Sequence, residues 1–182
     1  SNAGMCGALI PFYNMPHNIW AAGGGTLNHW LAKTVIIDNW KPVSEVLACE
    51  DIEARMDYLA GASMLVSADF LRDVGLLCED YFLYFEELDW HMRGKRRYSL
   101  AYADKAIVYH KVGCSTGKWD AVASRSTMKF HFRSQLRFTI RFFPYALPLV
   151  LIRIAKHHLK LMCLRLMHAA PKPVDELRPK LK

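Results

Sequence analysis

Three carboxylates lie within four residues of this chain, directly behind a run of aromatic side chains. The segment 82–90 reads Phe-Leu-Tyr-Phe-Glu-Glu-Leu-Asp-Trp, so Glu86, Glu87 and Asp89 follow Phe85 closely. A carboxylate placed against apolar surface carries a desolvation cost unless it is paired, bound to a metal or used in chemistry. This cluster is therefore the first place in the chain to look for chemistry.

Signals on either side of the cluster alternate between strand and helix, which predicts an α/β fold. Ser67 is a typical N-cap and Gly75 a typical stop, so we expect a short helix over 68–74. The acids then begin a second helix, from about 86 to 95, where negative charge complements the helix dipole. The glycines at 23–25 predict a plain turn or a loop that lines a ligand. Short apolar runs predict strands at 8–13, 34–37, 58–67, 99–102 and 106–110.

Charge divides the chain into two unlike parts. The net charge is +7, but residues 1–122 carry −4 and residues 123–182 carry +11. A basic tail on a slightly acidic body indicates an anionic partner, either lipid head groups or nucleic acid. The tail contains no nucleic-acid-binding module that we recognise, so we expect a membrane surface and no nucleic acid.

Side chains of the tail repeat with helical spacing. Basic residues recur every four positions over 125–141, with apolar residues at the same spacing beside them, and a second amphipathic stripe covers 152–170. The apolar run 142–152 is too short to cross a bilayer and is interrupted by proline. We therefore expect a basic amphipathic helical region over 123–170 that lies in the membrane interface. The alternative is a helix pair packed on the protein's own domain, with its basic side in water.

Cysteine usage and composition complete the domain organisation. The five cysteines are odd in number and scattered without a Cys-x-x-Cys pair, which indicates neither a disulfide framework nor a zinc site and favours a reducing, cytoplasmic setting. Ser1–Ala3 are typical of a tag-cleavage scar and carry no fold signal. We expect a catalytic-type domain over 4–122, the helical region over 123–170 and a flexible tail over 171–182.

Spacing alone leaves two interpretations of the acids. On a helix Glu86 and Glu87 point about 100° apart, whereas Glu86 and Asp89 lie on the same side. A carboxylate that faces a cleft could act as a general base. The alternative is a solvated helix N-terminus whose acids only offset the helix dipole.

An ordered set of segments resembles the C-terminal half of family 2 glycosyltransferases, most closely the rhamnosyltransferase-like and galactofuranosyltransferase-like branches. The matching segments lie between residues 8 and 118 and follow one another in the family's order. No single segment is specific, so the resemblance depends on the ordered set. The segments are 19–24, 57–65, 74–76, 81–93 and 106–110.

This resemblance implies a partial GT-A (nucleotide-diphospho-sugar transferase) fold, of which the chain holds the acceptor-side half. It implies an inverting transfer of a sugar from a nucleotide-sugar donor to a glycan or lipid-linked acceptor. In that family the second acid of a pair deprotonates the acceptor hydroxyl, and this position is Glu87 here, where the family usually has Asp. Glu86 and Asp89 would orient the acceptor or hold the helix. His110 matches a histidine that completes the coordination of a divalent metal, Mg²⁺ or Mn²⁺, in some relatives, with a capped strand end as the alternative.

The matching segments also imply an acceptor pocket. Gly61 and Ala62 match a step that lines this pocket, where small side chains leave room for a sugar. Asp57, Trp90 and Arg93 lie in the same matching segments and are expected to bind the acceptor. The base and the metal ligand are expected to face one open cavity, since an inverting transfer needs the base beside the acceptor and the metal beside the diphosphate.

The chain also departs from the family pattern. It contains no Asp-x-Asp metal motif and no nucleotide-binding βαβ units, and Cys78 stands where the family usually has Asp. We therefore expect that this chain alone does not transfer sugar. The resulting hypothesis is part of a bacterial glycosyltransferase of cell-surface polysaccharide synthesis, cytoplasmic and peripheral on the inner face of the cell membrane. The alternative is a non-catalytic lipid- or carbohydrate-binding domain on the same scaffold.

Overall fold

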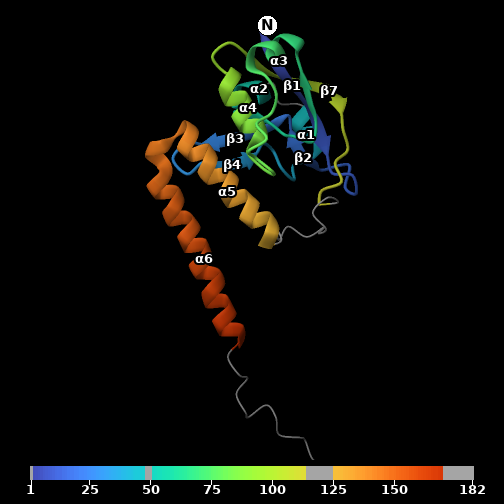
Figure 1. Ribbon diagram of the computed structural model, residues 1–182. Helices are drawn as coiled ribbons and strands as arrows, with labels where there is room; N and C mark the ends of the chain where they lie inside the picture. The colour runs from blue at the N-terminus through green and yellow to red at the C-terminus, as the bar shows by residue number, and fades with distance from the viewer. Residues whose placement is uncertain (1, 48–50, 114–124, 170–182) are drawn as a thin grey trace, which may run out of the picture.

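The structure is a computed structural model that describes residues 2–47, 51–113 and 125–169, with side chains left out at 125, 126 and 165–169. It has mixed α/β architecture, with a sheeted body and two long helices at its C-terminal side (Figure 1). The α/β class expected from sequence is confirmed, while the tail expected over 171–182 lies outside the described residues.

The elements are β1 (Ala3–Pro11), β2 (Ile19–Ala22), β3 (Gly24–Asn28), β4 (Lys33–Ile36), α1 (Val43–Leu47), α2 (Ile52–Arg55), β5 (Tyr58–Leu59), β6 (Met64–Val66), α3 (Ala68–Val74), α4 (Glu86–Gly94), β7 (Ser99–Ile107), α5 (Arg125–Phe142), η1 (Pro144–Ala146) and α6 (Leu147–Ala169).

Strand β1 is the centre of the larger sheet. It pairs in parallel with β7 along one edge and antiparallel with β6 and β2 along the other, which makes the sheet mixed. The two strands expected around 104–105 form one strand, and the register shifts there between the pairs Ala8–Ala103 and Leu9–Ile107. Beyond β7 the chain continues along β1, where the amide of His110 donates to the carbonyl of Pro11 at 2.9 Å.

The three glycines at 23–25 serve close strand packing rather than a ligand loop. Gly23 has a φ of +69° and joins β2 to β3. Strand β3 is the middle strand of the smaller sheet, whose order is β4-β3-β5. A Cβ on Gly24 would lie 1.8 Å from the carbonyl oxygen of Tyr58 on the neighbouring strand, so only glycine fits there. The turn was therefore predicted correctly at Gly23, and the strand packing was not.

The two helices expected in the body form at the expected places. Ser67 caps α3 by accepting a hydrogen bond from the amide of Phe70 at 3.1 Å, and Gly75 ends that helix with a φ of +82°. Phe70 then packs edge-on against Trp90 of α4 and against Tyr98, with ring centroids 5.6 and 5.3 Å away. These contacts hold α3 and α4 together in the main core beside β1.

Helix α5 is packed on the body, and its buried face is not the apolar row that the sequence suggests. Ile140 of that row is exposed, while Gln135, Phe138 and Thr139 are fully buried. The side-chain nitrogen Nε2 of Gln135 donates to the backbone carbonyls of Leu31 and Ala32 at 2.9 Å each. This placement matches the alternative of a helix pair packed on the domain, at least for α5.

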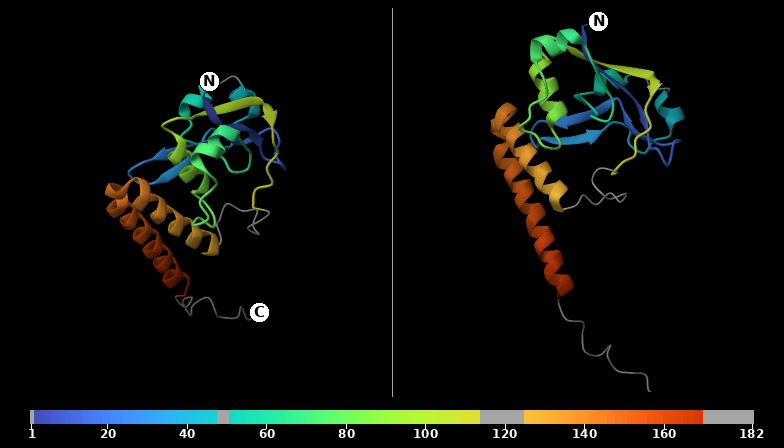
Figure 2. Two further views of the ribbon diagram at one scale, coloured as in Figure 1. Left: turned by 45° about the horizontal axis from the view of Figure 1, so that its top comes forward. Right: turned by 45° about the vertical axis from the view of Figure 1, so that its right-hand side comes forward.

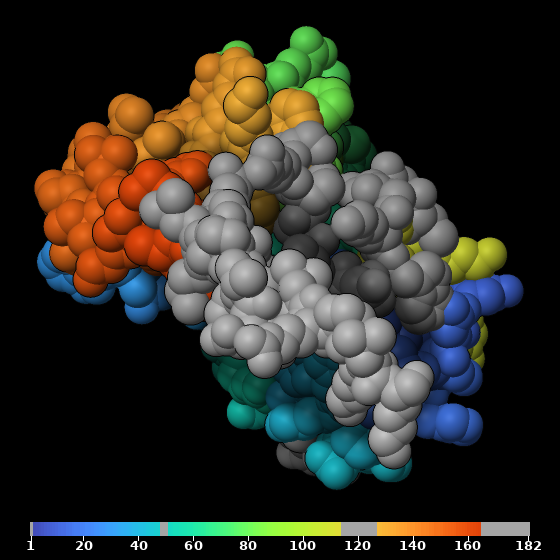
Figure 3. All heavy atoms as spheres, turned by 90° about the horizontal axis from the view of Figure 1, so that it is seen from below, coloured from blue at the N-terminus to red at the C-terminus, as the bar shows by residue number. Residues whose placement is uncertain are grey.

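Helix α6 returns alongside α5 and then extends away from the body (Figure 2). In the space-filling view from below, the orange and red atoms of the two helices form one block at one side of the molecule (Figure 3). Val150 near the start of α6 is buried, whereas Leu159 and Met162 further along are exposed. None of the helices in the described part of the chain has the length and apolar character needed to cross a membrane.

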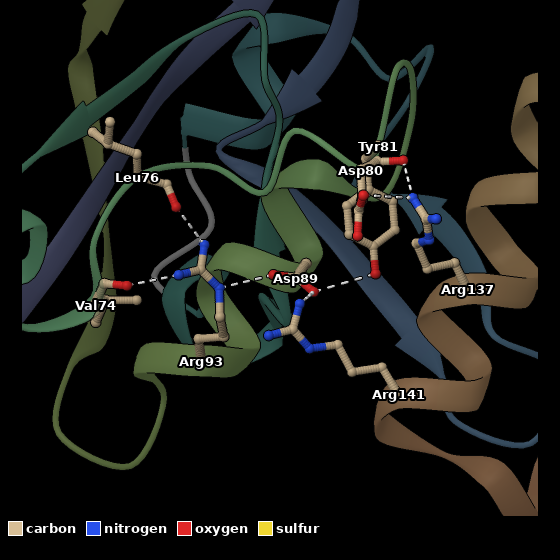
Figure 4. Close-up of polar contacts among 8 residues, drawn as sticks. All are labelled: Val74, Leu76, Asp80, Tyr81, Asp89, Arg93, Arg137 and Arg141. Atoms are coloured by element: carbon tan, nitrogen blue, oxygen red, sulfur yellow. Dashed lines mark hydrogen bonds and ion pairs between the residues drawn. The ribbon is translucent and has the colours of Figure 1, made fainter.

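Asp89 is the buried centre of the contact between α4 and α5. Its side chain has no exposed surface and accepts hydrogen bonds from Tyr81 Oη at 3.2 Å, Arg93 Nε at 2.8 Å and Arg141 Nη1 at 2.8 Å (Figure 4). Two arginines thus neutralise one carboxylate, which removes the cost of burying it. Arg141 comes from α5, so the acid joins the C-terminal helices to the body.

The same network fixes the segment between α3 and α4. Arg93 donates to the carbonyls of Val74 and Leu76 at 2.6 Å each, and the indole of Trp90 donates to the carbonyl of Gly75 at 2.8 Å. Arg137 of α5 also donates to the carbonyl of Asp80 (Figure 4). Backbone groups of the connecting segment are thereby satisfied by side chains from both helices.

Replacing Asp89 by Asn should lower the free energy of unfolding by about 3 kcal/mol, because two arginines would then face a neutral amide. Chemical denaturation measures this change. Asp69→Asn is the matched control, since its ion pair with Arg72 is exposed on both sides, and it should cost less than about 1 kcal/mol. A variant Asp89→Asn as stable as the wild type would contradict the assignment.

Candidate functional site

Backbone strain positions the acids at the start of α4. Tyr84 and Phe85 have φ values of +67° and +71°, in the left-handed region that aromatic residues rarely adopt. Phe85 is buried against Phe138 of α5, with ring centroids 5.3 Å apart, and Ser134 of α5 donates to the carbonyl of Leu83 at 2.9 Å. Strained conformations of this kind persist where surrounding packing enforces them, and they cluster at functional sites.

Glu87 lies against the exposed turn that follows β5. A Cβ on Gly61 would come within 2.2 Å of Glu87 Oε1, so the carboxylate occupies the space that a side chain there would need. Burial raises the pKa of Glu87 to about 7, with the charge of Glu86 adding to the shift and the Gly61 amide opposing it. The start of a helix normally favours the charged form of an acid, and here desolvation outweighs that effect.

Other titratable groups surround Glu87. Burial raises the pKa of Tyr58 to about 12, with the charges of Glu87 and Asp57 contributing. Burial lowers the pKa of His91 to about 4, helped by Lys95 and opposed by Asp57. Tyr58 belongs to β5, Asp57 directly precedes it, and Glu87 and His91 belong to α4, so two carboxylates, a phenol and a neutral imidazole come from these neighbouring elements.

Glu86 is a second partly buried acid. Burial raises the pKa of its carboxyl group, and the pKa of Tyr84 is raised by burial and by the charge of Glu86. The atom Oε2 of Glu86 is buried, and no hydrogen-bond partner for it lies among the described residues. An acid in this state favours its protonated form more than a solvated one does.

Three of the predicted site residues serve the fold in this structure. Asp89 and Arg93 are partners in the buried network at the end of α4, and Trp90 is buried in the main core. Asp57 also has a structural partner, because its Oδ2 accepts from the amide of Leu27 at 2.7 Å. Trp90 is turned inward, so this placement gives no support to its predicted contact with an acceptor.

The small residues expected to line an acceptor pocket are accessible. Gly61 and Ala62 form an exposed turn closed by the hydrogen bond from the Ser63 amide to the Ala60 carbonyl at 3.1 Å. They lie beside Glu87, as the sequence pattern suggested. An acceptor that reached this turn would therefore meet a carboxylate with a pKa close to neutral.

His110 lines an aromatic cavity. It follows β7, forms a bridge with Phe12, and its ring lies 4.4 Å from that of Trp20. Burial lowers the pKa of His110. The cavity beside it has a lining that includes His110 but not Glu87, so the expectation of both groups in one hollow stays a prediction.

His110 is the candidate ligand that the sequence suggested for a divalent metal. His110 lies among aromatic rings, and no group of three acidic, histidine or cysteine side chains in the described residues could hold a metal ion. These residues therefore do not complete a site for Mg²⁺ or Mn²⁺ by themselves. The role of His110 toward a metal stays a prediction.

Sequence reasoning missed the residues that set the environment of Glu87. Tyr58 and His91 lie on an expected strand and an expected helix, and no pattern distinguishes them from core positions. It also missed the aromatic cavity of Phe12, Trp20 and Trp40, whose residues are brought together by strand pairing. The signal that was present is the concentration of tryptophan and asparagine over 12–40.

Comparison with known proteins adds no family. No family model matches this chain, and no curated protein matches it. The geometry is therefore the basis for interpreting the site.

Glu87→Gln should remove a pH dependence of stability that the wild type shows between about pH 5 and 8. Because the folded-state pKa of Glu87 is raised to about 7, protonation stabilises the fold fully below the unfolded pKa of about 4.3, and that stability is lost as the pH rises through 7. At pH 8 the variant should be more stable than the wild type by roughly 3 kcal/mol. Denaturant unfolding at several pH values measures this difference.

The exposed acid Glu79 supplies the control for this measurement, because Glu79→Gln should leave the pH profile of the wild type unchanged. If Glu87→Gln and the wild type unfold with the same pH profile, the carboxylate of Glu87 is not held in a desolvated site.

Proposed function

We propose that this chain is the acceptor-side half of a GT-A, family 2-like inverting glycosyltransferase that builds a cell-surface polysaccharide or lipid-linked glycan. The observation that carries the proposal is Glu87, a largely buried carboxylate with a pKa of about 7 beside the exposed turn at Gly61 and Ala62. A general base works best when its pKa lies near the working pH, because it is then both unprotonated and able to accept a proton.

The proposed reaction uses Glu87 as the base. The carboxylate takes the proton of an acceptor hydroxyl while that oxygen forms a bond to the anomeric carbon of a nucleotide sugar. The bond from the anomeric carbon to the nucleoside diphosphate breaks on the opposite face, and the nucleotide leaves with the bonding electron pair. The proton ends on Glu87, and the small residues at the turn leave room for the acceptor. The donor and its divalent metal would be held mainly by residues outside those described.

Glu86 supports a pKa near neutral for the proposed base Glu87. Glu86 is a near neighbour whose negative charge raises the pKa of Glu87 further. Two close carboxylates resist being charged together, so the pair shares protons over a wider pH range than a single acid. Glu86 therefore has a positioning and electrostatic role in the proposal, with no direct contact to the reacting atoms required.

Helix α6 is the basis for a proposed membrane surface on the cytoplasmic side. Tyr145, just before the helix, and three residues of α6 at helical spacing are exposed and apolar, with Lys156 and Lys160 on the same side. Apolar side chains with interleaved lysines suit an anionic lipid interface, where the lysine stems lie along the apolar zone and the charges meet head groups. These three residues of α6 are Leu149, Ile152 and Leu159.

In the full-length enzyme that this proposal implies, Glu87→Gln should lower the turnover number by about 100-fold or more, because an amide cannot accept the proton. Glu87→Asp should retain part of the activity, since a carboxylate remains but sits one methylene further away. Transfer of radiolabelled sugar to an acceptor lipid or glycan measures both. Glu79→Gln is the matched control and should behave as the wild type.

The variant Gly61→Ala tests the position of the carboxylate. Its new Cβ would fall 2.2 Å from Glu87 Oε1, so the flexible end of that side chain must move. Turnover should fall at least tenfold while the unfolding midpoint stays close to the wild type. A non-catalytic binding domain would instead tolerate all three changes, and wild-type turnover in Glu87→Gln would refute the proposal.

The chain should also float with vesicles that contain anionic lipid, and it should do so much less with neutral vesicles. Replacing Leu149, Ile152 and Leu159 together by serine should reduce the bound fraction at least tenfold, because the apolar part of the interface is lost. The double change Leu65→Ser and Leu76→Ser is the control, since both residues are exposed on the body. Equal flotation of the two variants would contradict a membrane role for α6.

A further inference from the structure

An aromatic cavity lies at the end of β1, and Glu87 is not part of its lining. Its volume is about 240 Å³, below the range of pockets that take drug-sized ligands. Phe12 stacks on Trp40 with ring centroids 4.4 Å apart, and Trp20 stacks on His110 at the same separation. Two aromatic pairs therefore form the walls of a space suited to one small ring. The lining residues are Phe12, Tyr13, Asn14, Met15, Trp20, Asn39, Trp40, His110 and Val112.

Trp40 is presented to this cavity from a strained backbone. Its φ is +70°, and Asp38 two residues earlier has a φ of +54°. A bulky residue in the left-handed region is a true outlier, because its Cβ crowds the following carbonyl group. More than half of the surface of Trp40 is nevertheless exposed, at 56%, so burial of the indole does not explain why the strain is kept.

A buried ion-pair cluster holds the turn in this conformation. Asp38, with its side chain only 2% exposed, receives two hydrogen bonds from Arg55 at 2.9 and 3.0 Å and an ion pair from Lys41 at 2.8 Å. The amide of Trp40 donates to the carbonyl of Ile19 at 2.7 Å. The turn is fixed on both sides, and the indole is preorganised rather than free to fold onto the surface.

Amide groups lie beside the aromatic walls. The side-chain nitrogen of Asn39 donates to the carbonyl of Trp20 at 2.7 Å, which leaves the Asn39 carbonyl oxygen as an acceptor at the cavity. Asn14 adds an exposed amide to the same lining. Among the described residues the lining includes no carboxylate, lysine or arginine, although the ammonium of Lys111 lies 4.2 Å from the ring centroid of Tyr13, which lines the cavity. Neutral donors and acceptors around an apolar surface suit a ligand with several hydroxyl groups and no charge.

We propose that this cavity binds one sugar ring, packed against the exposed face of Trp40 with its hydroxyl groups on Asn14 and Asn39. The C–H groups on one face of a sugar ring carry partial positive charge and pack against the negative face of an aromatic ring. The rings within the Phe12–Trp40 and Trp20–His110 pairs are tilted to one another by 32° and 53°, so the lining is uneven rather than flat. The inference rests on the proposed function for the source of the sugar, which is an acceptor glycan or the sugar of a nucleotide donor.

The test is a binding titration of the 182-residue chain, followed by NMR of the tryptophan indole N–H groups. The probes are methyl hexopyranosides, disaccharides made from them, the corresponding nucleoside diphosphate sugars and the free nucleoside diphosphates. We expect saturable shifts of the Trp20 and Trp40 indole signals. The signals of Trp30, exposed on another part of the surface, and of Trp90, buried in the core, should not move.

Shifts with simple glycosides or disaccharides identify an acceptor glycan as the source. Shifts with nucleotide sugars, but not with free nucleoside diphosphates, identify the donor sugar. No shift with any probe, or an equal shift with the free nucleoside diphosphate, overturns the proposal.

Trp40→Gly should weaken saccharide binding at least tenfold, because it removes the stacking surface. Glycine adopts the required positive φ without strain, so the fold should be kept. Trp30→Ala is the matched control and should bind as the wild type. Asp38→Asn keeps the Trp40 side chain but loosens the ion-pair cluster that fixes its turn, so this variant should also weaken binding. Unchanged binding in Trp40→Gly would overturn the proposal.

Failure of this inference is distinguishable from failure of the proposed transfer. Glu87→Gln should bind saccharide as the wild type does, because Glu87 does not line the cavity. Loss of turnover in Glu87→Gln without saccharide binding at Trp40 would leave the transferase standing and remove this subsite. Saccharide binding at Trp40 together with wild-type turnover in Glu87→Gln would support this subsite and refute Glu87 as the base.

Discussion

The neutralisation of Asp89 is the interaction on which the rest of the structure depends. Burying a lone carboxylate with no exposed surface would carry a large desolvation cost, and the hydrogen-bonded ion pairs with Arg93 and Arg141 offset that cost. Because Arg141 belongs to α5, the same acid determines where the C-terminal helices lie against the body. The strained start of α4 follows from this arrangement, since Phe85 is packed under α5 and Glu87 is turned toward the exposed turn at Gly61.

The acids of the cluster are thereby divided between two roles. Asp89 is fully paired and stabilises the fold, whereas Glu87 is desolvated, forms no ion pair with any described residue, and has its pKa raised to about 7. Two carboxylates two positions apart on one helix point in different directions, so one meets the arginines and the other does not. Different surroundings on the two sides of α4 thus give two groups of the same chemistry a structural and a proposed chemical function.

Local signals predicted the parts of this fold that local chemistry controls. Ser67 and Gly75 bound α3 as expected, because a cap and a left-handed stop act within one turn of the chain. The tail was harder, since the buried face of α5 carries Gln135 and Thr139, whose partners lie on distant segments or on the helix itself. The contact of Glu87 with Gly61 and the bridge of His110 to Phe12 both join segments that are distant in the chain. Long-range pairing of that kind leaves no pattern in a single sequence.

The central claim is that the carboxylate of Glu87 titrates near neutral pH. An NMR titration of the chain with ¹³C-labelled glutamate side chains measures this directly, with Glu87→Gln used to assign the signal. The account predicts that the carboxyl carbon of Glu87 titrates with a pKa of about 7. A pKa near 4.3, the ordinary value for glutamate, would contradict the claim and remove the proposed base.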